Sequence, residues 1–123
     1  MKKRILIVDD EKDLVELLQL RIEAEGFEVD VAYDGEEALS KAKADIPDLI
    51  VLDIMMPKVN GFEVCRTLKK NPATQSVKII MVTAKTREED RFWGLEAGAD
   101  EYITKPFDFV HLLGKIKKSV GEK

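Results

Sequence analysis

The chain has 123 residues, a length that suits one domain with a real hydrophobic core. Hydrophobic residues make up 45% and charged residues 36%, a composition that excludes disordered and fibrous proteins. The net charge of −4 argues against a broad basic surface for nucleic acid, and no lysine and arginine cluster is interleaved with aromatic residues.

The cysteine count and the hydrophobic profile indicate the cellular setting. Cys65 is the only cysteine, which excludes an intramolecular disulfide and a cysteine-based zinc cluster and favours a reducing, cytoplasmic location. The apolar run at residues 5–8 ends at Asp9 and is too short for a signal peptide. No apolar stretch has the length of a membrane span, so we expect no membrane partner.

The first half of the chain alternates between strand-like and helix-like patterns. Residues 5–8 form a continuous apolar run typical of a buried strand. Residues 11–25 predict a helix that ends at Gly26 and has these side chains on its inner face: Leu14, Leu17, Leu18 and Ile22. Residues 27–33 alternate as a strand does, and Asp34 is expected to cap the helix that carries Ala38, Leu39 and Ala42.

The second half continues the alternation. Residues 48–52 predict a buried strand that ends at Asp53, and residues 77–82 predict another. Between them, Asn60 is expected to cap a helix that runs through Leu68 and is broken at Asn71-Pro72. Thr86 and Glu89 have the spacing of a capping box and predict the start of a further helix. This helix uses Phe92 and Leu95 as apolar residues and should end near Gly98. Residues 99–103 predict a short strand, and the last helix has the following residues inward: Val110, Leu113, Ile116 and Val120.

Five strand–helix repeats predict an α/β fold, a parallel sheet with helices on both faces and right-handed crossovers. A Rossmann-like strand order is one option, but five units in this length favour the flavodoxin-like order 2-1-3-4-5, a (βα)5 three-layer sandwich. The sequence contains no repeat, low-complexity segment or internal linker. We therefore predict one domain over residues 1–123, with no output domain within them.

The residues that indicate chemistry stand at the ends of the predicted strands. Asp9 and Asp10 end the first strand, Asp53 the third and Thr83 the fourth, and Lys105 follows the fifth. The C-terminal ends of parallel strands meet at one edge, and the first and third strands flank the switch point where ligands bind, so the five residues should converge. Three carboxylates repel unless a divalent cation joins them, and Mg²⁺ suits such a site. With Lys105 and Thr83 nearby, the pattern predicts transfer of a phosphoryl group to a carboxylate.

Four segments resemble one known family. They are residues 5–11 (Ile-Leu-Ile-Val-Asp-Asp-Glu), 49–57 (Leu-Ile-Val-Leu-Asp-Ile-Met-Met-Pro), 82–84 (Val-Thr-Ala) and 103–107 (Ile-Thr-Lys-Pro-Phe). In order and spacing they are similar to the receiver domains of response regulators in two-component signalling, of the chemotaxis-regulator type. The resemblance covers the whole chain.

The resemblance implies a role for each residue of the predicted site. Asp53 matches the phosphorylated aspartate, Asp10 a direct Mg²⁺ ligand and Asp9 an acidic partner that acts largely through water. The backbone carbonyl of Met55 matches the third protein ligand, and the site is expected to bind Mg²⁺ and to tolerate Mn²⁺. Thr83 matches the hydroxyl that turns toward the phosphoryl group.

The remaining matches concern phosphate contact and switching. Lys105 matches the phosphate-contacting lysine, and its bond to Pro106 is expected to be cis. Tyr102 matches the switch aromatic, which swings inward as Thr83 moves. The surface of the fourth helix, fifth strand and fifth helix would then be the signalling face.

The resemblance also implies partners. A sensor histidine kinase or a histidine phosphotransfer protein would donate the phosphoryl group, because His111, the only histidine, is expected at the surface and lacks the setting of a donor. The chain would catalyse only its own phosphorylation and dephosphorylation and signal to an unknown protein target. We expect a monomer or a phosphorylation-linked dimer, with no direct contact to nucleic acid.

Three alternatives fit less well. A haloacid-dehalogenase-like phosphatase also forms an aspartyl phosphate, but its two aspartates stand two residues apart, whereas Asp9 and Asp10 are adjacent and residue 11 is Glu11. A flavin- or nucleotide-binding module would need a phosphate loop after the first strand, which this sequence lacks. A degenerate receiver used only for docking would not need the complete set of site residues.

Overall fold

The sheet has five parallel strands in the order β2-β1-β3-β4-β5. The computed structural model describes residues 2–56, 58–84 and 96–121, and of Thr83 the backbone alone. The strands are β1 (Arg4–Val8), β2 (Glu28–Ala32), β3 (Leu49–Leu52), β4 (Lys78–Thr83) and β5 (Glu101–Thr104). The flavodoxin-like order is therefore confirmed, and the Rossmann-like order is excluded.

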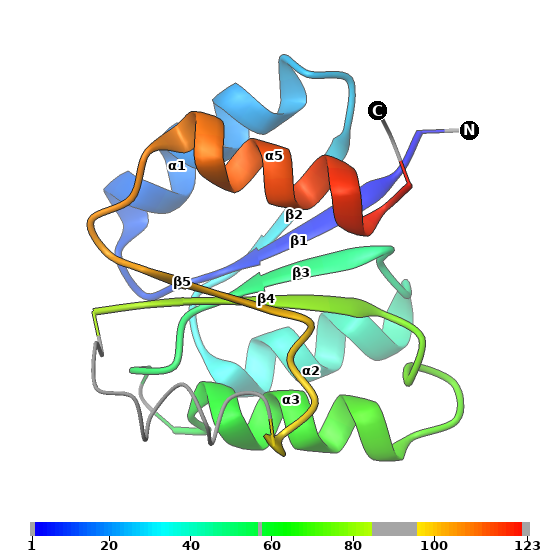
Figure 1. Ribbon diagram of the computed structural model, residues 1–123. Helices are drawn as coiled ribbons and strands as arrows, with labels where there is room; N and C mark the ends of the chain where they lie inside the picture. Colours follow the sequence, from blue (N-terminus) through cyan, green and yellow to red (C-terminus); the bar gives the residue numbers. More distant parts are fainter. Residues whose placement is uncertain (1, 57, 85–95, 122–123) are drawn as a thin grey trace.

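Helices cover both faces of this sheet. The described helices are α1 (Lys12–Glu23), α2 (Gly35–Ala44), α3 (Gly61–Lys70) and α5 (Phe109–Ser119). Figure 1 shows α1 and α5 over one face and α2 and α3 over the other, which gives three layers. The predicted helix that contains Thr86, Glu89, Phe92 and Leu95 lies outside the described residues. Within the described part of the chain, no helix is long and apolar enough to cross a membrane.

Alternation along β1 divides the hydrophobic core between the two layers. Leu6 and Val8 join the cluster under α2 and α3, whereas Ile5 and Ile7 join the cluster under α1 and α5. All four side chains are almost completely buried, which explains why the sequence of this strand is apolar without interruption. Each side of the sheet therefore contributes one of the two hydrophobic clusters of the core.

Two predicted inward positions prove to be on the surface. Leu17 of α1 is 52% exposed, and Val15, which is fully buried, takes the inner face together with Leu18 and Ile22. Val110 of α5 is 70% exposed, and Leu112 lies inward with Ile116. Both helices carry apolar residues on more than one side, so periodicity is compatible with more than one rotation of each helix about its axis. Contact with the sheet allows only one of these rotations.

The helix ends follow the expected capping chemistry. The Asp34 carboxylate accepts a hydrogen bond from the backbone N–H of Glu37 at the start of α2, and the Asn60 side chain accepts one from Glu63 at the start of α3. Gly26 follows α1 with a φ of 96°, and its N–H donates to the carbonyl of Glu23. These caps confirm the helix starts predicted at Asp34 and Asn60.

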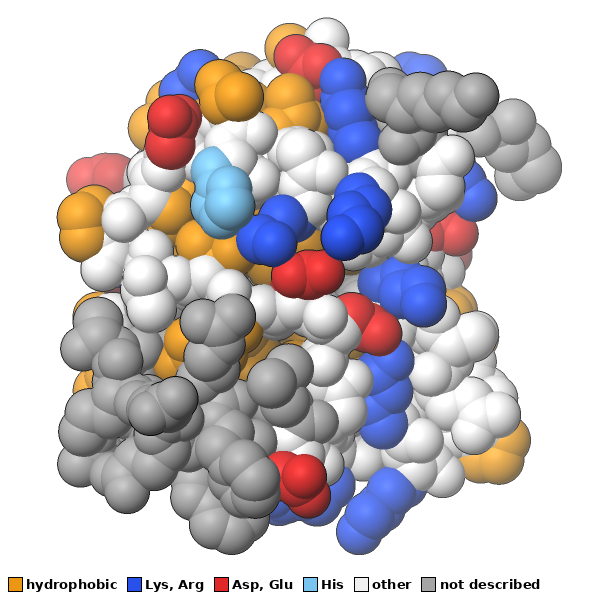
Figure 2. Space-filling model, in the orientation of Figure 1, with side chains coloured by type: hydrophobic (Ala, Val, Ile, Leu, Met, Phe, Trp, Pro, Cys, Tyr) orange, Lys and Arg blue, Asp and Glu red, His pale blue; other side chains and the backbone are white. Residues whose placement is uncertain are grey.

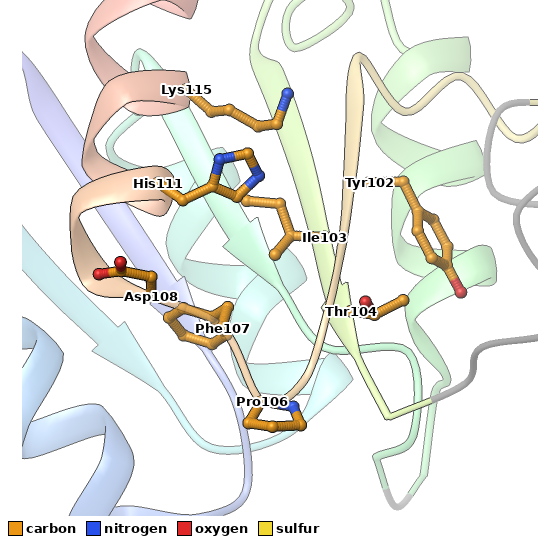
Figure 3. A pocket seen from close by; sticks show the side chains of 8 residues that line it. All are labelled: Tyr102, Ile103, Thr104, Pro106, Phe107, Asp108, His111 and Lys115. Atoms are coloured by element: carbon orange, nitrogen blue, oxygen red, sulfur yellow. The ribbon is translucent and has the colours of Figure 1, made fainter.

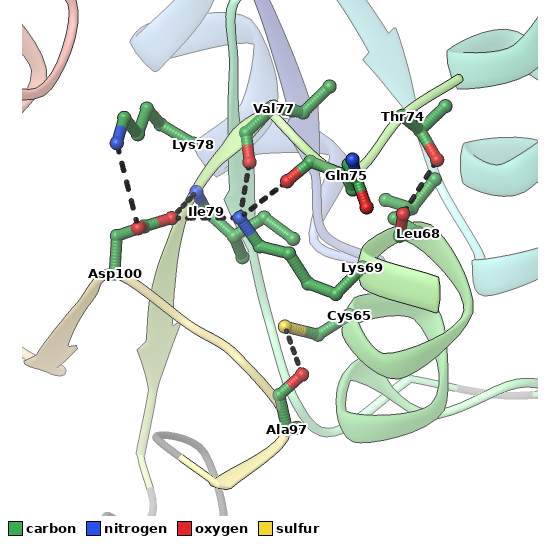
Figure 4. Close-up of polar contacts among 10 residues, drawn as sticks. All are labelled: Cys65, Leu68, Lys69, Thr74, Gln75, Val77, Lys78, Ile79, Ala97 and Asp100. Carbon is green, nitrogen blue, oxygen red and sulfur yellow. Dashed lines mark hydrogen bonds and ion pairs between the residues drawn. The ribbon is translucent and has the colours of Figure 1, made fainter. Parts of the chain in front are cut away.

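A group of polar contacts fixes the chain before β5 to α3 and β4 (Figure 4). The Asp100 carboxylate accepts the backbone N–H of Ile79 at 2.8 Å and the Lys69 ammonium at 3.3 Å. Lys69 also donates to the carbonyl of Val77 at 2.7 Å, and the Cys65 thiol donates to the carbonyl of Ala97 at 3.4 Å. Cys65 is fully buried in the core, and this burial, opposed in part by the charge of Lys69, raises the pKa of its thiol to about 12.

Candidate functional site

The ends of β1 and β3 bring two aspartates side by side. Val8 of β1 pairs with Leu52 of β3, and the N–H of Asp53 donates to the Val8 carbonyl at 3.0 Å. The N–H of Asp9 donates in turn to the carbonyl of Ala32, the last residue of β2, at 3.2 Å. Backbone hydrogen bonds thus set the positions of both carboxylates at the C-terminal edge of the sheet, where the strand order reverses.

Three carboxylates meet at this edge. Asp9, Asp10 and Asp53 each offer an oxygen, and these oxygens lie within 4.8 Å of one another. Asp9 and Asp53 are buried, with 4% and 5% of their surface exposed, whereas Asp10 is open to solvent. An all-oxygen set with one exposed member fits a hard cation that keeps part of its water shell, and Mg²⁺ is such a cation.

Lys105 provides the positive charge of the cluster. Its Nζ lies 2.7 Å from Asp9 Oδ2, 3.3 Å from Glu11 Oε1 and 3.8 Å from Asp53 Oδ2. Burial lowers the pKa of the Lys105 ammonium, but the hydrogen bond to Asp9 and the charges of Asp53 and Asp9 outweigh it and hold that pKa above its ordinary value. Lys105 therefore remains charged and bridges two buried carboxylates.

The ionisation of Asp53 shows that one ammonium does not neutralise this cluster. Burial, then the negative charge of Asp9 and to a smaller extent that of Asp10, act to raise the pKa of Asp53, which comes to about 6. Lys105 and the backbone N–H of Met55, which lies 3.3 Å from Asp53 Oδ1, act in the opposite direction without restoring the usual value. A second positive group would remove this conflict, so the residues present fit a divalent cation.

The other predicted site residues lie nearby. Met55 follows Asp53 with its side chain 57% exposed, so its backbone rather than its thioether faces the cluster through the N–H contact with Asp53. Thr83 ends β4 and pairs with Thr104 of β5, while its side chain lies outside the described residues. The bond between Lys105 and Pro106 is cis, as the resemblance implies.

Glu11 is a member of the site that the sequence analysis did not assign. Its side chain is 64% exposed and reaches Lys105, and its N–H donates to Asp9 Oδ1 at 3.0 Å. The signal was present in the sequence, because three consecutive acidic residues follow β1. The third residue became relevant only when the structure placed Lys105 within its reach.

Tyr102 lies inside the molecule, away from the exposed part of α5. Its side chain is 7% exposed and belongs to the cluster under α2 and α3, whereas Ile103 belongs to the other cluster. Figure 3 shows these two side chains on opposite sides of β5, with His111 and Lys115 of α5 on the side of Ile103. Together they line part of a hollow between β5 and α5.

His111 is exposed, as predicted, and is the single pale blue side chain in Figure 2. It stands near Lys115, whose Nζ lies 2.9 Å from Glu101 Oε1. His111 faces the hollow between β5 and α5, whereas Asp53 belongs to the carboxylate cluster at the C-terminal edge of the sheet, so His111 is not a member of that cluster.

Comparison with known proteins agrees with this arrangement. The model of the response regulator receiver domain family matches residues 5–117. The chain therefore belongs to the response regulator receiver domains of two-component signalling. The comparisons give no support to the haloacid-dehalogenase-like phosphatase alternative.

Individual relatives show the same class. The alkaline phosphatase synthesis transcriptional regulatory protein PhoP of Bacillus subtilis is 50% identical over 117 residues, which are 95% of this chain and 48% of that protein. The chain thus spans about half the length of this curated relative. A CheY-like receiver domain protein from Methanospirillum hungatei has a TM-score of 0.93 at 36% identity and covers 98% of this chain and 95% of its own. A putative response regulator from Chloroflexus aurantiacus has a TM-score of 0.93 at 33% identity, over 99% of this chain and 100% of that one.

Proposed function

We propose that Asp53 accepts a phosphoryl group in a Mg²⁺-dependent reaction and that the donor is a sensor histidine kinase or a histidine phosphotransfer protein. The observation that carries this proposal is the buried Asp53 carboxylate, with oxygens of Asp9 and Asp10 within 4.8 Å and the Lys105 ammonium 3.8 Å away. A carboxylate can act as the nucleophile in phosphoryl transfer when neighbouring groups position it and neutralise charge.

The residues of the chain have distinct tasks in this reaction. A carboxylate oxygen of Asp53 attacks phosphorus, so an O–P bond forms while the N–P bond of the donor phosphohistidine breaks and its electron pair returns to the imidazole. Asp9 and Asp10 would hold the cation together with Asp53 and the Met55 carbonyl, and Mn²⁺ would serve in place of Mg²⁺. Bound Mg²⁺ supplies positive charge beside the phosphoryl oxygens. Lys105 leaves Asp9 to pair with a phosphoryl oxygen, and the Thr83 hydroxyl donates to another.

The signal would then pass through Tyr102 to the surface that contains β5 and α5. Movement of Thr83 toward the phosphoryl group would free space that Tyr102 fills, which shifts the population between two packings. The reaction would be self-catalysed, and the protein target, the cytoplasmic location and the choice between a monomer and a phosphorylation-linked dimer belong to the same proposal. Neither nucleic acid nor a membrane is a direct partner in it.

The test is phosphorylation by a small acyl phosphate. The protein is incubated with acetyl phosphate and Mg²⁺ and its intact mass is measured. We expect the gain of one phosphoryl group in the wild-type chain, and no gain without divalent cation or in Asp53→Asn. Asp45→Asn is the matched control, because Asp45 pairs with Arg4 beyond the C-terminal end of α2. Normal phosphorylation of Asp53→Asn would refute the assignment.

A further inference from the structure

The loop between β3 and α3 rests on the first turn of α2. A β-carbon built at Gly35 would lie 2.1 Å from the carbonyl oxygen of Val59 and 2.7 Å from its Cβ. Only glycine permits so close an approach, because the nearest atom is backbone oxygen and has no flexible side chain to move. The loop and the helix are therefore in direct backbone contact at Val59.

An ion pair joins the same two segments one residue away. Lys58 Nζ lies 3.5 Å from Asp34 Oδ2 and 3.9 Å from Glu36 Oε2. Asp34 is itself fixed, because it accepts the N–H of Glu37 at 2.8 Å as the cap of α2. The backbone of Lys58 has a φ of 70°, a left-handed conformation that residues other than glycine rarely adopt unless their surroundings hold them there.

Backbone hydrogen bonds join the two ends of this loop to each other just after β3. The N–H of Gly61 donates to the carbonyl of Ile54 at 2.9 Å, and that of Met56 donates to the same carbonyl at 3.2 Å. A β-carbon at Gly61 would lie 2.5 Å from the carbonyl oxygen of Asp53. The described parts of the loop thus begin and end against the same strand end, which ties the segment that carries Met55 and the segment that carries Lys58 and Val59 to Asp53 and Ile54.

The segment that leads into α2 also contacts the end of β1. The last residue of β2, Ala32, accepts the N–H of Asp9, and Asp34 caps α2 two residues later. One short segment therefore contacts both the strand end that carries Asp9 and the loop that follows Asp53. It is placed to set the spacing between the two halves of the carboxylate cluster.

We propose that Gly35 and the ion pair between Lys58 and Asp34 are positioning elements for the cation site, and that they set its affinity for Mg²⁺ by fixing the loop that carries Met55. The inference rests on the proposed function, in which the Met55 carbonyl is a cation ligand. Neither Gly35 nor Lys58 touches the cation, and both act through the position of the loop. Residues that orient metal ligands commonly change metal affinity about tenfold or more when they are replaced.

Lys58→Glu tests the ion pair, because a purely electrostatic effect and a displacement of the loop would change the affinity for Mg²⁺ in opposite directions. A negative charge in place of a positive one attracts Mg²⁺ through space, so an electrostatic effect alone tightens binding. Repulsion from Asp34 and Glu36 would instead displace the loop, and we expect Mg²⁺ binding about threefold weaker by isothermal titration calorimetry. Lys58→Arg keeps the pair and should restore the wild-type affinity. Lys118→Glu makes the same charge change at an exposed position of α5 and serves as the control.

Gly35→Ala tests the backbone contact, and Gly114→Ala is its matched control because a β-carbon at Gly114 would meet nothing within 4 Å. We expect Mg²⁺ binding about tenfold weaker in Gly35→Ala and unchanged in Gly114→Ala. If circular dichroism shows that Gly35→Ala is unfolded, the Lys58 variants decide the question.

The outcomes separate the two proposals. Unchanged or tighter Mg²⁺ binding in Lys58→Glu, with wild-type phosphorylation intact, overturns the positioning role alone. A wild-type protein that binds no Mg²⁺ overturns the proposed function and this inference with it.

Discussion

The Asp53 carboxyl group is buried beside two other carboxylates, and this setting makes its ionisation costly. Its pKa is raised to about 6, first by burial and then by the charge of Asp9. In the unfolded chain the same group titrates near its ordinary value of about 4. Without a cation, the folded state therefore binds the proton more tightly than the unfolded state, and Asp53 destabilises the fold increasingly as the pH rises from about 4 to about 6.

Asp53→Asn is expected to stabilise the cation-free protein. At pH 7.5 in EDTA, the free energy of unfolding should rise by roughly 2 kcal/mol, because the amide has no charge to desolvate. The gain should shrink as the pH falls from 6 to 4 and vanish below about 4, where the wild-type carboxyl group is protonated in both states. Urea unfolding at several pH values measures this difference.

Mg²⁺ provides the control for this prediction. A cation that binds only the folded wild-type protein raises its stability, so saturating Mg²⁺ should reduce or reverse the advantage of Asp53→Asn. A gain that is the same at pH 4 and pH 7.5 would contradict the electrostatic explanation.

The residue types of the site were predictable, but not all of their contacts. Three strand-end aspartates and a lysine after the last strand were enough to predict a cation and a phosphoryl group, because few other partners satisfy such a set. That Lys105 lies 2.7 Å from Asp9 and 3.8 Å from Asp53, and also contacts Glu11, depended on side-chain packing. Sequence spacing carries no information on such distances.

At the scale of elements, the N-terminal cap of α3 lies next to the carboxylate cluster. Asn60 accepts the N–H of Glu63, and the next residue, Gly61, lies against the backbone of Asp53. The start of α3 therefore fixes the end of the loop that follows β3. A helix whose first turn frays would release this loop.

Replacement of Asn60 tests this link. Asn60→Ala removes the side-chain acceptor and should lower the free energy of unfolding by about 1 kcal/mol, whereas Asn60→Asp should change it by only a few tenths, because Asn and Asp cap equally well. Urea unfolding measures both variants. Equal destabilisation by Ala and Asp would show that the side chain acts through something other than an accepted hydrogen bond.

The sequence did not determine how α1 and α5 are rotated about their own axes. Along α1, the residues Leu14, Val15, Leu17 and Leu18 spread around the helix, and periodicity alone put Leu17 rather than Val15 inward. In the structure Val15 is fully buried and Leu17 is half exposed. The choice follows from contact with the sheet, because only one stripe of a helix fits between its neighbours.

At the scale of the whole molecule, the described helices cover both faces of the sheet, and neighbouring residues of one strand pack against opposite layers. Leu6 packs under α2 and α3, and Ile7 packs under α1 and α5. Both side chains are almost completely buried. The stability of the site edge therefore depends on both layers.

Truncation of either residue should be costly. We expect Leu6→Ala and Ile7→Ala each to lower the free energy of unfolding by about 2–5 kcal/mol, the range for buried large-to-small changes. Leu20→Ala is the matched control, because Leu20 is 69% exposed, and it should change stability by no more than about 0.5 kcal/mol. Chemical denaturation monitored by circular dichroism checks all three. A small effect of Leu6→Ala or Ile7→Ala would mean that one helical layer contributes little.

The sequence by itself determined the class of fold and its strand order, and it predicted which residues the sheet would bring to one edge. Continuous apolar strands are recognised from the order of the residues, and a parallel sheet requires helices on both faces and places the C-terminal strand ends at one edge. The capping residues Asp34 and Asn60 fixed two helix starts for the same local reason.

The tertiary structure alone decided how strongly the site groups interact. The raised pKa of Asp53, the bridge made by Lys105 and the contact of Gly35 with Val59 arise between segments that are distant in the sequence. Burial and interatomic distance set these energies, and both quantities exist only once the layers have packed.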